Sequence, residues 1–382
     1  VQVPVWIRGQ ESLTIVSPAR HEMAMLGLGR SVGTGPDGIT AEVIRAESFD
    51  AFQALTDEAI RGRIVLFDAP YEGYGRTVPY RVDAASVAAR RGAVAVLVRS
   101  VGLDGMRTAH TGAMRYAEDA DQIPAAAIST EDANQIARML ARGDTVRAQL
   151  HMDARTLEDR TSHNVVGEIR GSTRADEVIV VGGHIDSWDV GQGAQDDGVG
   201  CLLAMEAVRL IHASDLRPAR TLRVVLWTNE ENGLRGGKAY ALEHADDLDH
   251  FFAAMETDTG NGLISGFRFD LRAAALDDAA TEAELTAARD RGLGLLESLA
   301  PLLAPLDAGS MLLSYSGADI GPLAEAGVPS IGVSHDTSEY FRIHHSDADT
   351  FDRINMADMQ NNAAVLAIML YALADMDASL RP

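Results

Sequence analysis

The chain has 382 residues, of which 46% are hydrophobic and 23% charged, and its formal net charge is −23. The length suggests about two domains, and the composition is that of a globular chain rather than a disordered one. The strong negative charge argues against nonspecific binding to nucleic acid or to an anionic membrane surface. The single cysteine, Cys201, excludes an internal disulfide and a multi-cysteine zinc site.

The sequence contains no apolar run that approaches the ~20 residues needed to span a bilayer. Because the chain begins at Val1 rather than at a methionine, we expect an N-terminal segment to have been removed. A signal peptide would have gone with it, so the compartment cannot be read directly.

The glycine-rich stretch at 27–35 does not have the spacing of a dinucleotide-binding loop, and we interpret it as an ordinary loop. The segment 62–158 then predicts a small α/β module. Strands are expected at 62–70, 94–100 and 123–130, and helices at 83–93 and 131–144. Nothing in this module clusters histidine, cysteine or paired carboxylates, so we predict that it is not catalytic.

From about residue 163 the pattern predicts a larger α/β domain. Strands are expected at 177–186, 221–231, 251–258 and 327–334, and helices at 198–214, 236–248, 281–303 and 355–376. The strands are nearly continuous apolar runs that alternate with helices. This arrangement implies a mostly parallel sheet that helices cover on both faces.

Histidines and acidic residues follow the strands of this second domain. They are His184 and Asp186 after the first strand, Glu230 and Glu231 after the second, Glu256 and Asp258 after the third, Asp196 and Asp197 in a glycine-rich loop, and His344 and His345 near the end. In such sheets, ligands bind at the carboxyl ends of the strands. Each residue alone has an ordinary explanation, because a strand-end aspartate usually caps a turn and a single histidine is seldom a ligand.

The joint pattern has a more specific explanation. Five or more carboxylates at one sheet edge would repel one another unless one or two divalent cations compensated their charge. Histidines and carboxylates without thiolates fit zinc, and also manganese or cobalt. Of the adjacent Glu230 and Glu231, one can bind metal while the other acts as general base.

These motifs and their order resemble the co-catalytic zinc aminopeptidase and glutamate carboxypeptidase family. The motifs are GGHIDSWDVGQGAQDDG (182–198), LWTNEENG (226–233), METDTG (255–260) and HHSDADT (344–350). Sequence stretches that resemble the same family also occur near the start, in LGLGRSVGTGPDGITAEV, and in the first module, in RTVPYR and AHTG. The resemblance therefore covers essentially the whole chain.

The resemblance implies a zinc-exopeptidase, phosphorylase/hydrolase-like α/β fold with a mostly parallel central sheet flanked by helices and an inserted protease-associated α/β domain. On this interpretation residues 1–40 form a leader segment of the catalytic domain. Residues 41–158 form the protease-associated domain, and residues 159–382 form the di-zinc peptidase domain.

The resemblance also assigns the site, position by position. The implied metal ligands are His184 and Asp258 on one zinc, Glu231 and His345 on the other, and Asp196 between them. Glu230 would be the general base and then the acid for the leaving amine, and Asp186 would orient His184. His344 would either stabilise the oxyanion or have a structural role, and the sequence leaves both open.

The implied activity is hydrolysis of dipeptides or short peptides with a free N-terminus, by two zinc ions or by manganese or cobalt in their place. The alternatives are an aminopeptidase acting on longer peptides, a glutaminyl-cyclase-like acyltransferase, and an inactive receptor-like binding relative. A complete ligand set speaks against the inactive relative, and the bridging Asp196 against a one-zinc acyltransferase. The resemblance further implies a homodimer that is secreted or periplasmic.

Overall fold

The structure, a computed structural model, describes residues 1–276 and 280–382. These residues form two compact units. Unit 1 comprises Val1–Val3, Thr161–Tyr340 and Thr350–Pro382, and unit 2 comprises Pro4–Arg160 and Phe341–Asp349. Unit 2 therefore interrupts unit 1 twice along the chain.

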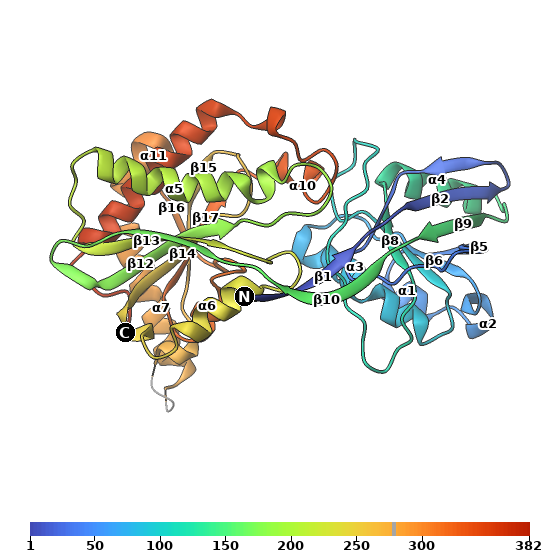
Figure 1. Cartoon of the computed structure of the whole chain (residues 1–382), viewed down its shortest axis with the longest axis horizontal. Helices are drawn as coiled ribbons and strands as arrows, with labels where there is room; N and C mark the ends of the chain where they lie inside the picture. Colours follow the sequence, from blue (N-terminus) through green and yellow to red (C-terminus); the bar gives the residue numbers. More distant parts are fainter. Residues whose placement is uncertain (277–279) are drawn as a thin grey trace. The chain divides into compact units, whose positions relative to one another are not determined.

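Unit 1 is built on a seven-stranded sheet of order β11-β13-β12-β14-β17-β15-β16. Figure 1 labels the strands from β12 to β17. The four central strands, β12 (Arg174–His184), β13 (Arg220–Trp227), β14 (Phe251–Glu256) and β17 (Ser330–His335), are parallel. Toward the edges, β11 (Val165–Ile169) and β15 (Ile264–Asp270) pair antiparallel to this centre, and β16 (Ser310–Leu313) pairs parallel to β15. The predicted fold class is confirmed, although the complete sheet is mixed.

Helices cover both faces of this sheet because its central strands are apolar on both sides. Successive side chains of a strand point to opposite faces, so Ile179 and Val181 enter one core and Val178 and Val180 the other. The first core is closed by α5 (Val199–Ala213) and α11 (Met356–Asp375), which lie side by side. The second is closed by α6 (Arg235–Glu243) and α9 (Gly321–Glu325). The remaining helices are α7 (Glu282–Glu297), α8 (Ala300–Leu303) and α10 (Tyr340–Ile343).

The first core is expected to carry much of the stability of unit 1. Leu366 of α11 is fully buried there, so Leu366→Ala should lower the free energy of unfolding by about 2–5 kcal/mol through lost apolar burial and a residual cavity. Urea denaturation followed by circular dichroism would measure the change. Gln360→Ala is the control, because Gln360 is exposed on the same helix. Equal effects of the two substitutions would contradict this role of the core.

Unit 2 contains an eight-stranded sheet of order β3-β2-β9-β5-β6-β7-β8-β4. Its strands are β2 (Glu11–Ser17), β3 (His21–Met23), β4 (Met25–Gly27), β5 (Ile39–Ala46), β6 (Ile64–Phe67), β7 (Ala95–Arg99), β8 (Ala125–Ile128) and β9 (Arg147–Met152). Its helices are α1 (Phe49–Gln53), α2 (Asp57–Ile60), α3 (Tyr74–Ala89) and α4 (Thr130–Ala141). A separate ribbon pairs β1 (Gln2–Ile7) with β10 (Arg155–Thr161).

The N-terminal segment lies in unit 2 and extends its sheet. β2 pairs with β9, and β5 pairs with both β9 and β6. These pairings place residues 4–40 with the inserted unit, which begins earlier than the sequence-based boundary at residue 41. Helix α3 likewise begins at Tyr74 rather than near residue 83, and it contains Pro79.

None of the helices in the described part of the chain combines the length and hydrophobicity that a membrane span requires.

Candidate metal centre

The parallel strands of unit 1 bring the predicted site residues of that unit to one edge of the sheet. In the strand register, His184 at the end of β12 lies beside Trp227 at the end of β13, and Gly182 lies beside Glu256 at the end of β14. The turns after β13 and β14 carry Glu230, Glu231 and Asp258. The carboxyl ends of these strands therefore form the site, as expected for an open α/β sheet.

A glycine-containing turn returns the chain from β12 to the same edge. Gly191 and Gly193 have φ of 66° and 59°, a region in which residues with a side chain are strained. A Cβ on Gly193 would also lie 2.4 Å from Cβ of Ser187. The turn leads to Asp196 and Asp197, which are joined by a cis peptide bond, and it brings Asp196 back to His184.

His184 lies at the centre of a group of carboxylates. Its Nε2 is 3.1 Å from Oδ1 of Asp196 and 3.5 Å from Oδ1 of Asp258. Atoms able to bind metal come within 4.8 Å of one another in two sets, His184 with Asp196 and Glu231, and His184 with Asp197 and Asp258. One imidazole nitrogen with several carboxylate oxygens is a donor set that zinc accepts. The residues present therefore fit a metal ion.

The electrostatics of the group point the same way. Burial raises the pKa of Asp197 well above its usual value, and the charge of Asp258 adds to the rise. Burial also raises the pKa of Glu230 well above its usual value, together with Glu231 and Asp258 and against the opposing effect of His184. Buried carboxyl groups that lie close together do not all ionise readily unless a positive charge compensates their negative charges. A divalent cation would provide that positive charge.

Asp186 holds both His184 and the turn after β13, but through different atoms. Its main-chain oxygen is 2.8 Å from Nδ1 of His184, whereas its carboxylate oxygen Oδ1 is 3.9 Å from that nitrogen. The carboxylate instead accepts a hydrogen bond from the backbone N–H of Glu230 at 3.0 Å. The orienting group for His184 is thus the carbonyl, which leaves Nε2 directed at the carboxylates.

Asp197 and Trp188 contact the site, although sequence reasoning gave neither of them a role. The Asp197 carboxylate accepts from the backbone N–H groups of His184 (3.1 Å) and Gly200 (3.0 Å). The indole N–H of Trp188 donates to Oε2 of Glu231 at 2.6 Å. The duplicated aspartate was a signal for Asp197, but no spacing in the sequence singles out Trp188.

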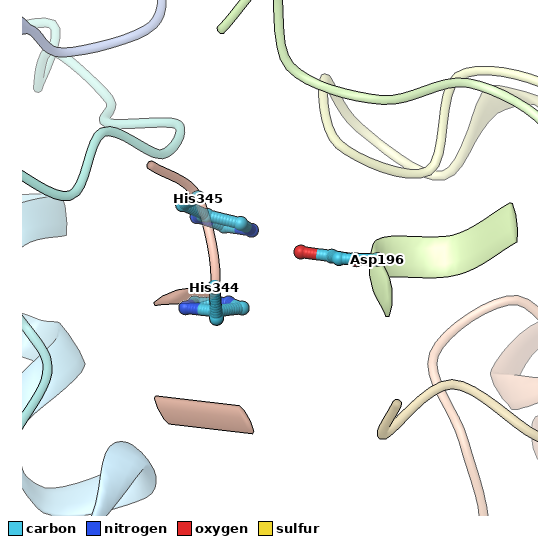
Figure 2. A group of neighbouring side chains, drawn as sticks. All are labelled: Asp196, His344 and His345. Atoms are coloured by element: carbon cyan, nitrogen blue, oxygen red, sulfur yellow. The ribbon is translucent and has the colours of Figure 1, made fainter. Parts of the chain in front are cut away.

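The two predicted histidines of the late motif lie on the segment Phe341–Asp349, which belongs to unit 2. Their rings are stacked with centroids 3.6 Å apart, and Figure 2 draws both rings. The main-chain oxygen of His345 accepts from the N–H of Thr111 at 2.8 Å, and its Nδ1 is 3.3 Å from the Thr111 oxygen. The ring of His344 meets Tyr74 edge-on at 5.2 Å.

Glu256 and His335 occupy strand ends beside the site and have structural partners. Glu256 accepts from the backbone N–H groups of Ala318 and Ile320, each at 2.9 Å, and burial raises its pKa to about 7. Nδ1 of His335 lies 2.8 Å from the main-chain oxygen of Gly262. These bonds account for the two side chains without a metal.

Two family models match the chain. The family described as peptidase family M28 matches residues 164–370, and the PA domain matches residues 31–136. Carboxypeptidase Q of Mus musculus is 41% identical over 380 residues, which cover 100% of this chain and 77% of the mouse protein. Carboxypeptidase Q of Homo sapiens has the same identity and coverage.

Solved structures agree in fold. The peptidase M28 precursor of Shewanella amazonensis SB2B superposes with a TM-score of 0.92 at 36% identity, covering 100% of this chain and 84% of that one. BSAP, a zinc aminopeptidase from Bacillus subtilis, has a TM-score of 0.66 at 18% identity, covering 100% of this chain and 86% of that one. At this lower identity, the likeness concerns the fold alone.

Proposed function

Since the chain belongs to peptidase family M28, we propose that it hydrolyses dipeptides or short peptides that have a free N-terminus. It is a zinc metallopeptidase of the exopeptidase type. The observation that carries the proposal is the convergence of His184 with Asp196, Glu231 and Asp258 at one edge of the sheet. The relatives named carboxypeptidase Q support an exopeptidase.

The proposed ligands of two zinc ions are His184, Asp258, Glu231, His345 and Asp196, the last as the bridge. The first three and Asp196 come from unit 1. His345 belongs to unit 2, and its assignment rests on the sequence resemblance. Manganese or cobalt would suit the same oxygen and nitrogen donors.

The chemistry follows from the residues around the proposed metals. Zinc bound there would polarise the peptide carbonyl and lower the pKa of a water. Glu230, beside the ligands, takes the proton of the attacking water and returns it to the leaving nitrogen. A carboxylate can accept this proton and release it again, as the exchange requires. His344 would contribute to oxyanion stabilisation if it contacts the substrate, and is otherwise structural.

Substrate preference tests the proposal. We expect dipeptides to be hydrolysed with a kcat/KM about 10–100-fold higher than their N-acetylated forms, because a free amino terminus can form a charge-assisted hydrogen bond that a blocked terminus loses. Tripeptides with the same first two residues provide the length series. Rates would be measured by amine release at fixed zinc. A preference for blocked peptides would contradict the proposal, and a preference for longer ones would favour an aminopeptidase of broader length range.

The proposed setting is a secreted or periplasmic homodimer with no nucleic-acid partner. The net charge of −23 argues against binding to nucleic acid, which is also negatively charged. Sedimentation of the purified chain would test the dimer.

A further inference from the structure

Trp188 donates its indole N–H to Glu231, one of the proposed metal ligands. Nε1 lies 2.6 Å from Oε2, and each residue is only 7% exposed. A hydrogen bond from a neutral N–H to an ionised carboxylate is shorter and stronger than one between neutral groups. This bond ties the turn after β12 to the turn after β13.

The same turn also holds Glu230, but by its main chain. The backbone N–H of Glu230 donates to the carboxylate of Asp186 at 3.0 Å, while the carbonyl of Asp186 accepts from His184. Trp188 and Asp186, two residues of one turn, therefore hydrogen-bond to the adjacent residues Glu231 and Glu230 in different ways. Glu231 is held by its carboxylate, whereas the hydrogen bond from the turn to Glu230 does not involve the Glu230 side chain.

We propose that Trp188 is a positioning residue that directs the Glu231 carboxylate to the metal and thereby separates the tasks of Glu231 and Glu230. This inference rests on the proposed function. An indole N–H can only donate, so it binds the carboxylate oxygen and cannot itself compete for a cation. Holding one carboxylate oxygen fixes the direction of the other. Groups that hold a metal ligand in this way typically change metal affinity by about 10–100-fold.

Trp188→Phe tests the role because it keeps an aromatic ring and removes the donor. We expect one of two zinc ions to bind about 10–100-fold more weakly, and the cobalt-loaded variant to show an altered d–d absorption spectrum. Excess zinc should restore kcat with KM unchanged. Trp6→Phe is the matched control, because Trp6 also loses one indole hydrogen bond, to the main-chain oxygen of Ser31 at 2.9 Å. Equal zinc affinities in the two variants would overturn the inference.

A second measurement uses the natural tryptophan, in case Trp188→Phe does not fold. The chain has three tryptophans, so a sample labelled with ¹⁵N at the indole gives three N–H signals in a heteronuclear NMR spectrum. Zinc titration should move the downfield signal of Trp188 and leave that of Trp6, assigned with Trp6→Phe, in place. A Trp188 signal that zinc does not move would overturn the inference. Failure of the wild-type chain to bind zinc or cleave peptides would instead overturn the proposed function.

Discussion

Glu230→Gln is expected to lower kcat by about 10²–10⁴-fold, the usual contribution of a general acid–base group. Glutamine keeps the shape of the side chain but cannot accept the proton of the attacking water. The backbone N–H of residue 230 still donates to Asp186 in the variant, so the turn should remain in place. Metal content, measured by elemental analysis, should be unchanged, and steady-state kinetics should show a larger change in kcat than in KM.

Two further glutamate-to-glutamine variants serve as controls for this result, one at a proposed metal ligand and one at an exposed position. Glu231→Gln should lose metal as well as activity, because an amide is a poorer zinc ligand than a carboxylate. Glu243→Gln, at an exposed position in α6, should change neither. Full turnover by Glu230→Gln would reassign the general base. Loss of metal from Glu230→Gln would instead identify Glu230 as a ligand and exchange the roles of the two glutamates.

The central strands of unit 1 were predictable because a strand buried on both faces leaves a continuous apolar run. β12, with seven successive buried residues at its end, is the clearest example. The edge strands β11 and β16 were missed, since most of their residues are exposed and the strands have only five and four residues. The strands of the N-terminal segment were missed for another reason. β2 pairs with β9, which lies more than a hundred residues away in the sequence. A local sequence pattern does not predict which distant strand will be the partner.

The sequence predicted which residues lie at the candidate site, but it did not predict the hydrogen bonds between them. Residue type and strand order sufficed to place His184, Asp196, Glu231 and Asp258 at one edge. The conformation of the turn after β12 was not predictable from residue type. It makes the carbonyl of Asp186 the partner of His184, and it places Trp188 against Glu231.

Removing the metal is expected to lower activity by about 10³-fold or more, because polarising the carbonyl and activating water are worth several kcal/mol in the transition state. Dialysis against a chelator, followed by return of zinc, manganese or cobalt, would measure the loss and its recovery. Elemental analysis should find about two ions per chain in the active form, one for each pair of proposed ligands. Dialysis against zinc-containing buffer without chelator is the control.

The same treatment should lower the midpoint of thermal unfolding, since an ion that binds the folded chain stabilises it. The expected cause is specific to this site. Without a cation, burial and the neighbouring charge of Asp258 raise the pKa of both Asp197 and Glu230 well above their usual values, so keeping these carboxylates ionised costs free energy in the folded chain. Full activity in chelator with no bound ion would contradict metal-dependent hydrolysis. Full activity with one ion would remove the need for a bridging Asp196 and favour the one-zinc alternative.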